Sequence, residues 1–156
     1  MVAFGSMWVG TFGALTQVRI KRFIAYTSIS QVGFIMLGLA SLSLGGLIAA
    51  ILYLLIYAIT SVVFFTLLLN TNHIVTKKNP RYFSELYYIS VYNNRFAHYL
   101  SVFLLSMAGV PPLGGFIGKL FIYISAIDAG LELVVFFSLL LSLISTYYYL
   151  NVIQYI

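Results

Sequence analysis

Long apolar runs, separated by short polar stretches, dominate the pattern along the chain. A run of roughly 20 apolar residues is long enough to cross a bilayer as an α-helix. Strands are excluded because an open sheet would leave backbone groups unpaired in lipid, and no segment alternates as a membrane barrel does. The pattern therefore predicts an all-α integral membrane protein with one membrane domain over 1–156. Its helices, about five, are expected near 2–17, 23–44, 46–70, 96–127 and 131–155.

The fourth run, 96–127, carries residues that a membrane helix usually avoids. Gly109 is followed by Pro111 and Pro112, and each proline lacks a backbone N–H and strains the preceding turn. The helix is therefore expected to be discontinuous between Gly109 and Pro112. Backbone carbonyls freed at such a break are tolerated at membrane depth where they are buried in protein or line a hydrated cavity. Gly115 allows a neighbouring helix to approach closely.

The composition agrees with a membrane protein and excludes several kinds of site. Of the 156 residues, 62% are hydrophobic and 7% are charged, which is too few charges for the surface of a soluble domain. Because the chain has no cysteine and its two histidines, His73 and His98, are far apart, we predict no bound metal or redox cofactor. We expect membrane lipids as partners and no nucleic acid.

The charged residues predict how the chain is oriented. Lys21 and Arg22 lie in the first turn, whereas Asp128 and Glu132 lie in the fourth. Successive turns alternate between the two sides of the membrane, so every basic residue except Lys119 falls on one side. By the positive-inside rule that side is the cytoplasm or the mitochondrial matrix. The N-terminus is then outside and the C-terminus inside, with Lys21 and Arg22 as an anchoring pair.

The polar connection at 71–95 is expected to lie along the membrane interface. Its apolar residues have helix-like spacing, and aromatic side chains with flanking lysines are typical interfacial anchors. The residues with this spacing are Tyr82, Phe83, Leu86, Tyr87 and Ile89.

Lys119 is the basic residue inside a predicted span. It lies about nine residues before Asp128, or roughly 13 Å along a helix, which is close to the middle of a ~30 Å hydrocarbon core. A charged lysine there costs on the order of 3 kcal/mol, so such residues usually face a protein interior or a hydrated cavity. Because no acid is predicted at that depth, either a partner chain supplies the counter-charge or burial lets the ammonium exchange its proton near neutrality. We expect a proton relay, with a lysine satisfied by carbonyls or a carboxylate as the alternative.

Two stripes of polar side chains are candidates for lining a route to this lysine. Spacings of three or four residues put side chains on one face of a helix. The alternative is that these stripes serve close helix packing and interhelical hydrogen bonds. The candidate path-lining residues are Tyr26, Thr27, Ser30, Gln31, Ser142 and Ser145.

Three segments of the chain carry a resemblance to a known family: QVRIKRFIAYTSISQVGFIMLGL at 17–39, SMAGVPPLGGFIGKLFIY at 106–123 and AGLELVVFFSLLLSLISTYYYLNVI at 129–153. They resemble the antiporter-like membrane subunits of respiratory complex I, and the STYYYL ending points more narrowly to subunit 2 of NADH dehydrogenase.

The resemblance implies a membrane subunit of the proton-translocating NADH:ubiquinone oxidoreductase that carries no redox centre and uses Lys119 as the lysine of its broken helix. It matches Lys21 and Arg22 to the basic pair that opens the next helix. NADH, flavin, iron–sulfur clusters and ubiquinone are then bound elsewhere in the complex, and the other membrane subunits are partners. Gln31 stands where relatives often carry histidine and Asn151 where arginine is common, so a relay through Gln31 is not expected.

The similarity covers nearly all of this chain but only the C-terminal part of the family's sequence. We therefore expect a split subunit whose N-terminal half is a separate chain. The absence of a presequence and of cysteine, with abundant Phe, Tyr, Ile and Asn, favours an organelle gene and the mitochondrial inner membrane. Two other functions fit the same residues: a secondary sodium/proton antiporter, and a scaffold subunit in which Lys119 only pairs with a partner's carboxylate.

Overall fold

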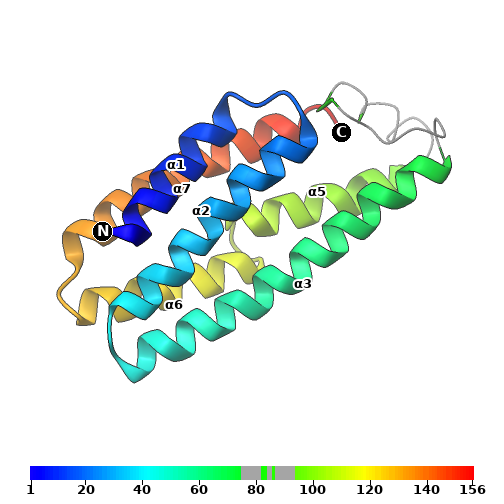
Figure 1. Ribbon diagram of the computed structural model, residues 1–156. Helices are drawn as coiled ribbons and strands as arrows, with labels where there is room; N and C mark the ends of the chain where they lie inside the picture. Colours follow the sequence, from blue (N-terminus) through cyan, green and yellow to red (C-terminus); the bar gives the residue numbers. More distant parts are fainter. Residues whose placement is uncertain (75–81, 84–85, 87–93) are drawn as a thin grey trace.

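The computed structural model describes residues 1–74, 82–83, 86 and 94–156, and within these residues every regular element is an α-helix (Figure 1). The all-α prediction is confirmed. The predicted fourth helix is discontinuous as expected, because it consists of two helices separated by residues 109–113. The helices are α1 (Val2–Leu15), α2 (Ile20–Ala40), α3 (Leu44–Ile74), α5 (Asn94–Ala108), α6 (Gly114–Asp128) and α7 (Glu132–Ile153).

The helix lengths are those of a multi-pass membrane protein. Ile20–Ala40, Leu44–Leu69 and Glu132–Ile153 are each long and apolar enough to cross a membrane. Helices α5 and α6 have 15 residues each, about 22 Å at 1.5 Å per residue, so each alone is shorter than a ~30 Å core. In Figure 1 they follow one another along the length of α3 and together replace one continuous span.

Figure 1 also shows the two ends of the bundle. Helix α1 packs against α2 and α7, while α3 packs against α2 and both halves of the broken helix. The turn between α1 and α2, with Arg19 in it and Lys21 and Arg22 in the first turn of α2, lies at the end where the chain finishes. The turn between α6 and α7, flanked by Asp128 and Glu132, lies at the other end, near the N-terminus. The described basic turn and the acidic turn are therefore separated by the length of the bundle.

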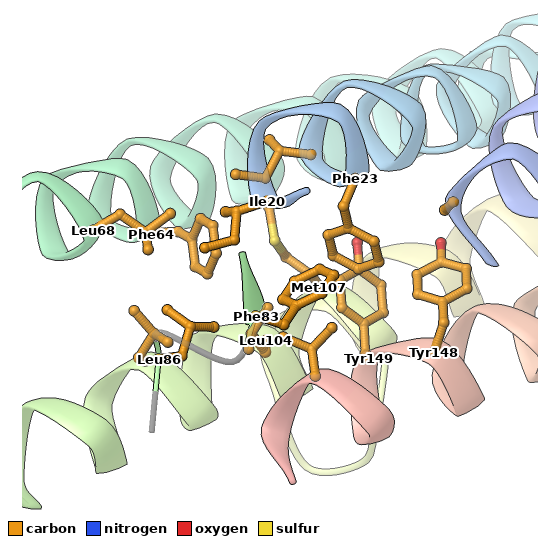
Figure 2. Packing of buried hydrophobic residues seen from close by; sticks show 14 of the residues in the cluster. Ile20, Phe23, Phe64, Leu68, Phe83, Leu86, Leu104, Met107, Tyr148 and Tyr149 are labelled. Atoms are coloured by element: carbon orange, nitrogen blue, oxygen red, sulfur yellow. The ribbon is translucent and has the colours of Figure 1, made fainter. Parts of the chain in front are cut away.

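The buried apolar side chains form two clusters, one toward each end. In the cluster near the C-terminus, Phe23 makes edge-to-face contacts with Phe83, Tyr148 and Tyr149 at centroid distances of 5.2–5.8 Å (Figure 2). We call this the C-end cluster; it includes Phe23, Phe64, Leu68, Phe83, Leu86, Leu104, Met107, Tyr148 and Tyr149. The N-end cluster includes Met7, Phe34, Leu37, Tyr53, Ile122 and Leu141.

The connection predicted at 71–95 is described only in part, and it begins later than predicted. Helix α3 continues to Ile74, so the first residues of that stretch are helical. Phe83 and Leu86 are buried in the C-end cluster. The spacing identifies an apolar face of this segment, and at these two residues the bundle covers that face; an interfacial location of the connection stays a prediction.

One further residue of the connection contacts the α1–α2 turn. Tyr82 is exposed and forms an isolated backbone bridge with Arg19, which ties this segment to the α1–α2 turn. Residues 75–81, 84–85 and 87–93, with Tyr87 and Ile89, lie outside the described residues.

Candidate functional site

Lys119 is buried between the two apolar clusters, with 4% of its surface exposed. Its Nζ donates to the carbonyl oxygens of Ala108 at 3.1 Å and Met107 at 3.5 Å. The ammonium also lies 4.8 Å from the centroid of the Phe34 ring, within range of a cation–π contact. The lysine of α6 therefore reaches back to the last two residues of α5.

The sequence explains why these two oxygens are free to accept. In a continuous α-helix the carbonyl of residue i accepts from the N–H of residue i+4. For Met107 and Ala108 those donors would belong to residues 111 and 112, which are both prolines and have no N–H. The Pro111–Pro112 pair thus removes the two donors that would occupy the oxygens contacted by Lys119.

Gly109 forms the turn that ends α5. Its φ of +84° lies in the left-handed region that glycine adopts without steric cost. Its N–H donates to the carbonyls of Leu105 and Ser106, both at 3.1 Å, so these earlier oxygens are satisfied by backbone. A Cβ on Gly109 would lie 3.2 Å from Nζ of Lys119, so the missing side chain also leaves room for the ammonium.

Gly115 brings the two halves of the broken helix into contact. A Cβ at this buried position would overlap the carbonyl oxygen of Ser106 in α5. Gly118, one turn before Ile122, has the ring of Tyr53 in the space that a Cβ would take. Because α6 passes so close to α5 and α3, Lys119 can reach the end of α5 with a fully buried side chain.

Gln31 of α2 reaches the same break from another side. Its Nε2 donates to the Met107 carbonyl oxygen at 3.1 Å and to the Tyr149 hydroxyl at 3.4 Å. The Tyr53 hydroxyl donates to its Oε1. Gln31, Tyr53 and Tyr149 are each at most 3% exposed. The described polar groups around the break therefore come from α2, α3, α6 and α7, together with the end of α5.

The predicted path-lining residues of α2 other than Gln31 make local or packing contacts. Thr27 donates to the Ile24 carbonyl at 2.9 Å. Ser30 shares a 3.2 Å hydrogen bond with Thr11 of α1. The half-buried Tyr26 packs against Gly13 of α1, where a Cβ would overlap its ring. These contacts agree with helix packing, and lining of a path stays a prediction for Tyr26, Thr27 and Ser30.

The predicted residues of α7 behave in the same way. Ser142 donates to the Leu139 carbonyl and Ser145 to the Ser142 carbonyl, both at 2.7 Å. Their neighbour Thr146, which the spacing did not single out, has its Oγ1 3.5 Å from the Ala108 oxygen that Lys119 contacts. Path lining by Ser142 and Ser145 also stays a prediction.

The remaining predicted residues lie at surfaces of this chain. Lys21 and Arg22 are exposed at the start of α2, and Pro111 and Pro112 are exposed at the break. Among the described residues Lys119 has no ion pair, since Asp128 and Glu132 are exposed at the bundle end. Within that same part of the chain, no group of His, Asp or Glu side chains could hold a metal ion.

A cavity of about 360 Å³ lies away from the lysine, among α1, α2 and α7. Its wall combines apolar side chains with Gln17, Tyr147, Asn151 and Tyr155. Its lining residues belong to α1, the turn after it, α2, the last part of α7 and the residues that follow α7, together with Phe83. The cavity therefore opens near the C-terminal end of the bundle and not onto Lys119.

Sequence comparison relates the chain to a family of membrane proteins. The family model described as NADH:quinone oxidoreductase/Mrp antiporter, transmembrane, matches residues 1–145. NADH-quinone oxidoreductase subunit N of Paramagnetospirillum magneticum is 38% identical over 153 residues, covering 98% of this chain and 31% of the relative. The chloroplastic NAD(P)H-quinone oxidoreductase subunit 2 of Chaetosphaeridium globosum is 40% identical over 155 residues, covering 96% and 29%. The chain spans about a third of the length of these relatives.

Solved structures share the arrangement of helices. Respiratory complex I from Thermus thermophilus with bound aureothin matches with a TM-score of 0.82 and 29% identity, over 97% of this chain and 34% of that one. The Mrp complex from Dietzia sp. DQ12-45-1b matches with a TM-score of 0.84 and 27% identity, over 97% and 28%. The fold by itself therefore does not distinguish between these two kinds of assembly.

Proposed function

The chain belongs to the NADH:quinone oxidoreductase/Mrp antiporter transmembrane family, and from that premise we propose that it forms part of a proton-translocating membrane subunit of complex I. Lys119 is the proton relay, and carbonyl oxygens at the break between α5 and α6 accept hydrogen bonds from its side chain. The redox steps take place elsewhere in the complex, where NADH, flavin, iron–sulfur clusters and ubiquinone are bound. The proposed role of this chain is to move protons while other subunits move electrons.

The contact of Lys119 with the freed Ala108 and Met107 carbonyls carries this proposal. Carbonyl oxygens accept hydrogen bonds from an ammonium but bring no negative charge that would hold the proton permanently. A neutral lysine can still donate to the same oxygens, so both protonation states have partners at the break. A carboxylate partner would instead favour the charged state strongly.

The energy for translocation must reach this site from outside the chain. Moving one elementary charge against 100 mV costs about 2.3 kcal/mol. We propose that neighbouring subunits supply it by changing the hydration or the acceptors of Lys119, so that the proton is taken up on one side and released on the other.

The proposal is tested by two substitutions of Lys119 in the assembled complex. Lys119→Met removes the proton carrier and Lys119→Arg keeps a cation that does not deprotonate in proteins. We expect both variants to lower the number of protons pumped per electron in membrane vesicles, with the complex still assembled. Pumping restored by arginine would instead indicate the scaffold function, in which only the charge matters, and normal stoichiometry in both variants would contradict the relay.

A second candidate function is secondary sodium/proton antiport, and the similarity to the Mrp complex of Dietzia favours it. The same lysine would then exchange protons against sodium without a redox reaction. Vesicles that contain the assembly distinguish the two functions. Antiport predicts sodium-dependent proton exchange in the absence of NADH, whereas the complex I function predicts pumping that requires NADH oxidation and quinone.

Location, orientation and partners complete the proposal. We propose the mitochondrial inner membrane, with the basic α1–α2 turn on the matrix side and the N-terminus in the intermembrane space. A separate chain would supply the part of the subunit that the longer relatives have and this chain lacks. Other complex I membrane subunits would surround the two chains. Co-migration with a large NADH-oxidising particle is the expected result of native electrophoresis, and protease access to the α6–α7 turn from the intermembrane side tests the orientation.

A further inference from the structure

The side chains of Tyr53 and Gln31 form a hydrogen-bonded chain that ends on the Met107 carbonyl, one of the two acceptors of Lys119. We propose that Gln31 is a positioning residue which, held by Tyr53, occupies the Met107 oxygen and so directs the Lys119 ammonium toward Ala108. This inference rests on the proposed relay function of Lys119 and names the residues that set its acceptors.

The chemistry of the partners fixes the orientation of the Gln31 amide. A backbone carbonyl oxygen only accepts, so the amide nitrogen must face Met107. The amide oxygen then faces Tyr53, whose hydroxyl donates to it. A flipped amide would set two oxygens against each other at Met107. Tyr53 and Met107 therefore hold the same orientation from opposite sides of the amide.

The distances at the break agree with a division of the two carbonyls. Gln31 lies 3.1 Å from the Met107 oxygen, while Lys119 lies 3.5 Å from that oxygen and 3.1 Å from the Ala108 oxygen. A hydrogen bond of 3.5 Å is at the weak limit of the usual range. The amide thus takes the shorter contact at Met107, and the ammonium takes the shorter contact at Ala108.

The same amide connects the break to the rest of the bundle. Gln31 belongs to α2, Tyr53 to α3 and Tyr149 to α7, and their contacts meet at the last turn of α5 and at Lys119 of α6. A shift of α3 or α7 relative to α5 would change which donor occupies Met107. Gln31 is therefore placed to pass helix displacement on to the acceptors of the lysine without exchanging a proton itself.

The titratable groups around this site decide whether a change in the pH dependence of pumping can be assigned to Lys119. The titratable side chains near the described chain of contacts are tyrosines: Tyr53 and Tyr57 of α3, Tyr123 of α6, and Tyr148 and Tyr149 of α7. Helix α2 contributes the neutral Gln31 and the Phe34 ring, and the end of α5 contributes backbone carbonyls. Of the described groups around the break Lys119 is the one amine, and the proposed relay assigns the change of charge to it.

The test is the pH dependence of proton pumping by the assembled complex, scaled to the amount of complex present. Gln31→Leu removes the competing donor, so the Met107 oxygen becomes a full second acceptor for the ammonium. The charged form of Lys119 is then stabilised, and we expect the alkaline midpoint of pumping to move up by roughly 0.5–1 pH unit. Tyr53→Phe, which removes one oxygen and keeps the ring, should move it in the same direction by less.

Matched controls separate positioning from a general packing effect. Tyr57→Phe makes the same change one turn along α3, and Gln154→Leu makes it at an exposed residue after α7; both should leave the midpoint in place. If Tyr53 acts through Gln31, adding Tyr53→Phe to Gln31→Leu should cause no further shift. An unchanged or lowered midpoint in Gln31→Leu, or additive shifts in the double variant, would overturn the positioning role. Normal pumping by Lys119→Met, measured in parallel, would instead remove the relay function itself.

Discussion

Helix α3 and the broken pair α5 and α6 lie side by side in the bundle (Figure 1). They differ in which groups donate hydrogen bonds to their backbone carbonyl oxygens. Helix α3 runs through 31 residues from Leu44 to Ile74 without a charged side chain. Hydroxyl groups within α3 form additional hydrogen bonds to carbonyls of the same helix, since Thr60 and Thr66 donate to carbonyls one turn earlier at 2.9 and 2.8 Å. The broken pair leaves two carbonyl oxygens for a lysine. A membrane-spanning segment can therefore accommodate a buried lysine where the backbone N–H donors of the helix are missing.

A break supplies acceptors, but the lysine must also be able to reach them. Lys119 lies 11 residues after Ala108 along the sequence. The contact forms because the first turn of α6 passes directly beside the end of α5, where Gly115 meets the Ser106 carbonyl. The comparison with α3 thus separates two requirements. The prolines leave carbonyl oxygens without their helical donors, and the glycine lets α6 approach α5 closely.

The largest effect is expected from removing the close approach. Gly115→Ala places a methyl group on the Ser106 carbonyl, which is backbone and cannot rotate away. Forced overpacking of this kind typically costs about 1–3 kcal/mol. We expect the thermal stability and the yield of the assembled complex to fall, as measured by native electrophoresis after stepwise heating.

The adjacent glycine is the matched control for this substitution. A Cβ at Gly114 would meet the Ile56 side chain at 3.6 Å, which is an ordinary contact. Gly114→Ala should therefore be neutral or stabilise by up to about 1 kcal/mol. Equal losses from Gly114→Ala and Gly115→Ala would show that the close approach of α5 and α6 does not hold the break together.

A smaller effect is expected from restoring the missing donors. Pro111→Ala gives residue 111 an N–H for the Met107 oxygen, and Pro112→Ala gives residue 112 one for Ala108. If α5 extends like α3, these donors compete with Lys119 for the same oxygens. We expect Pro112→Ala to lower pumping more than Pro111→Ala, because Ala108 is the nearer acceptor, at 3.1 Å against 3.5 Å. One net hydrogen bond of about 1 kcal/mol corresponds to roughly a fivefold change at most.

The order of the two proline variants is the sharp part of this prediction. Pumping per electron is measured in vesicles that contain equal amounts of complex. A larger loss from Pro111→Ala would assign the ammonium to Met107, and equal pumping in both variants and the parent would show that the freed carbonyls do not matter to the lysine.

The break and the burial of its lysine could be predicted because both follow from local chemistry. The Pro111–Pro112 pair forces an interruption wherever it occurs in a helix, and a lysine far from either end of a span must be buried or hydrated. The observed break at residues 109–113 and the 4% exposure of Lys119 confirm these two expectations.

The partners of the lysine could not be predicted because they depend on how helices rotate against one another. Spacing placed Gln31 on a polar stripe with Thr27, but Gln31 turns to the break while Thr27 bonds to its own helix. Tyr53 and Phe34 are aromatic residues in largely apolar helices, a pattern typical of ordinary core packing, so the sequence does not single them out as partners of the lysine. Such residues become visible only when the contacts between α2, α3 and α6 are known.

The smallest effect is expected where a lysine has neither a break nor burial. Lys21 and Arg22 are exposed at the start of α2, so water solvates both charges and neither depends on a freed carbonyl. Exposed substitutions usually change stability by no more than about 0.5 kcal/mol, and Lys21→Met should leave protons pumped per electron unchanged while Lys119→Met lowers them. The two variants delete the same cation and differ only in its surroundings, so the comparison isolates the environment of the amine. Loss of pumping in Lys21→Met as large as that in Lys119→Met would place the basic pair on the proton route and end its interpretation as an anchor.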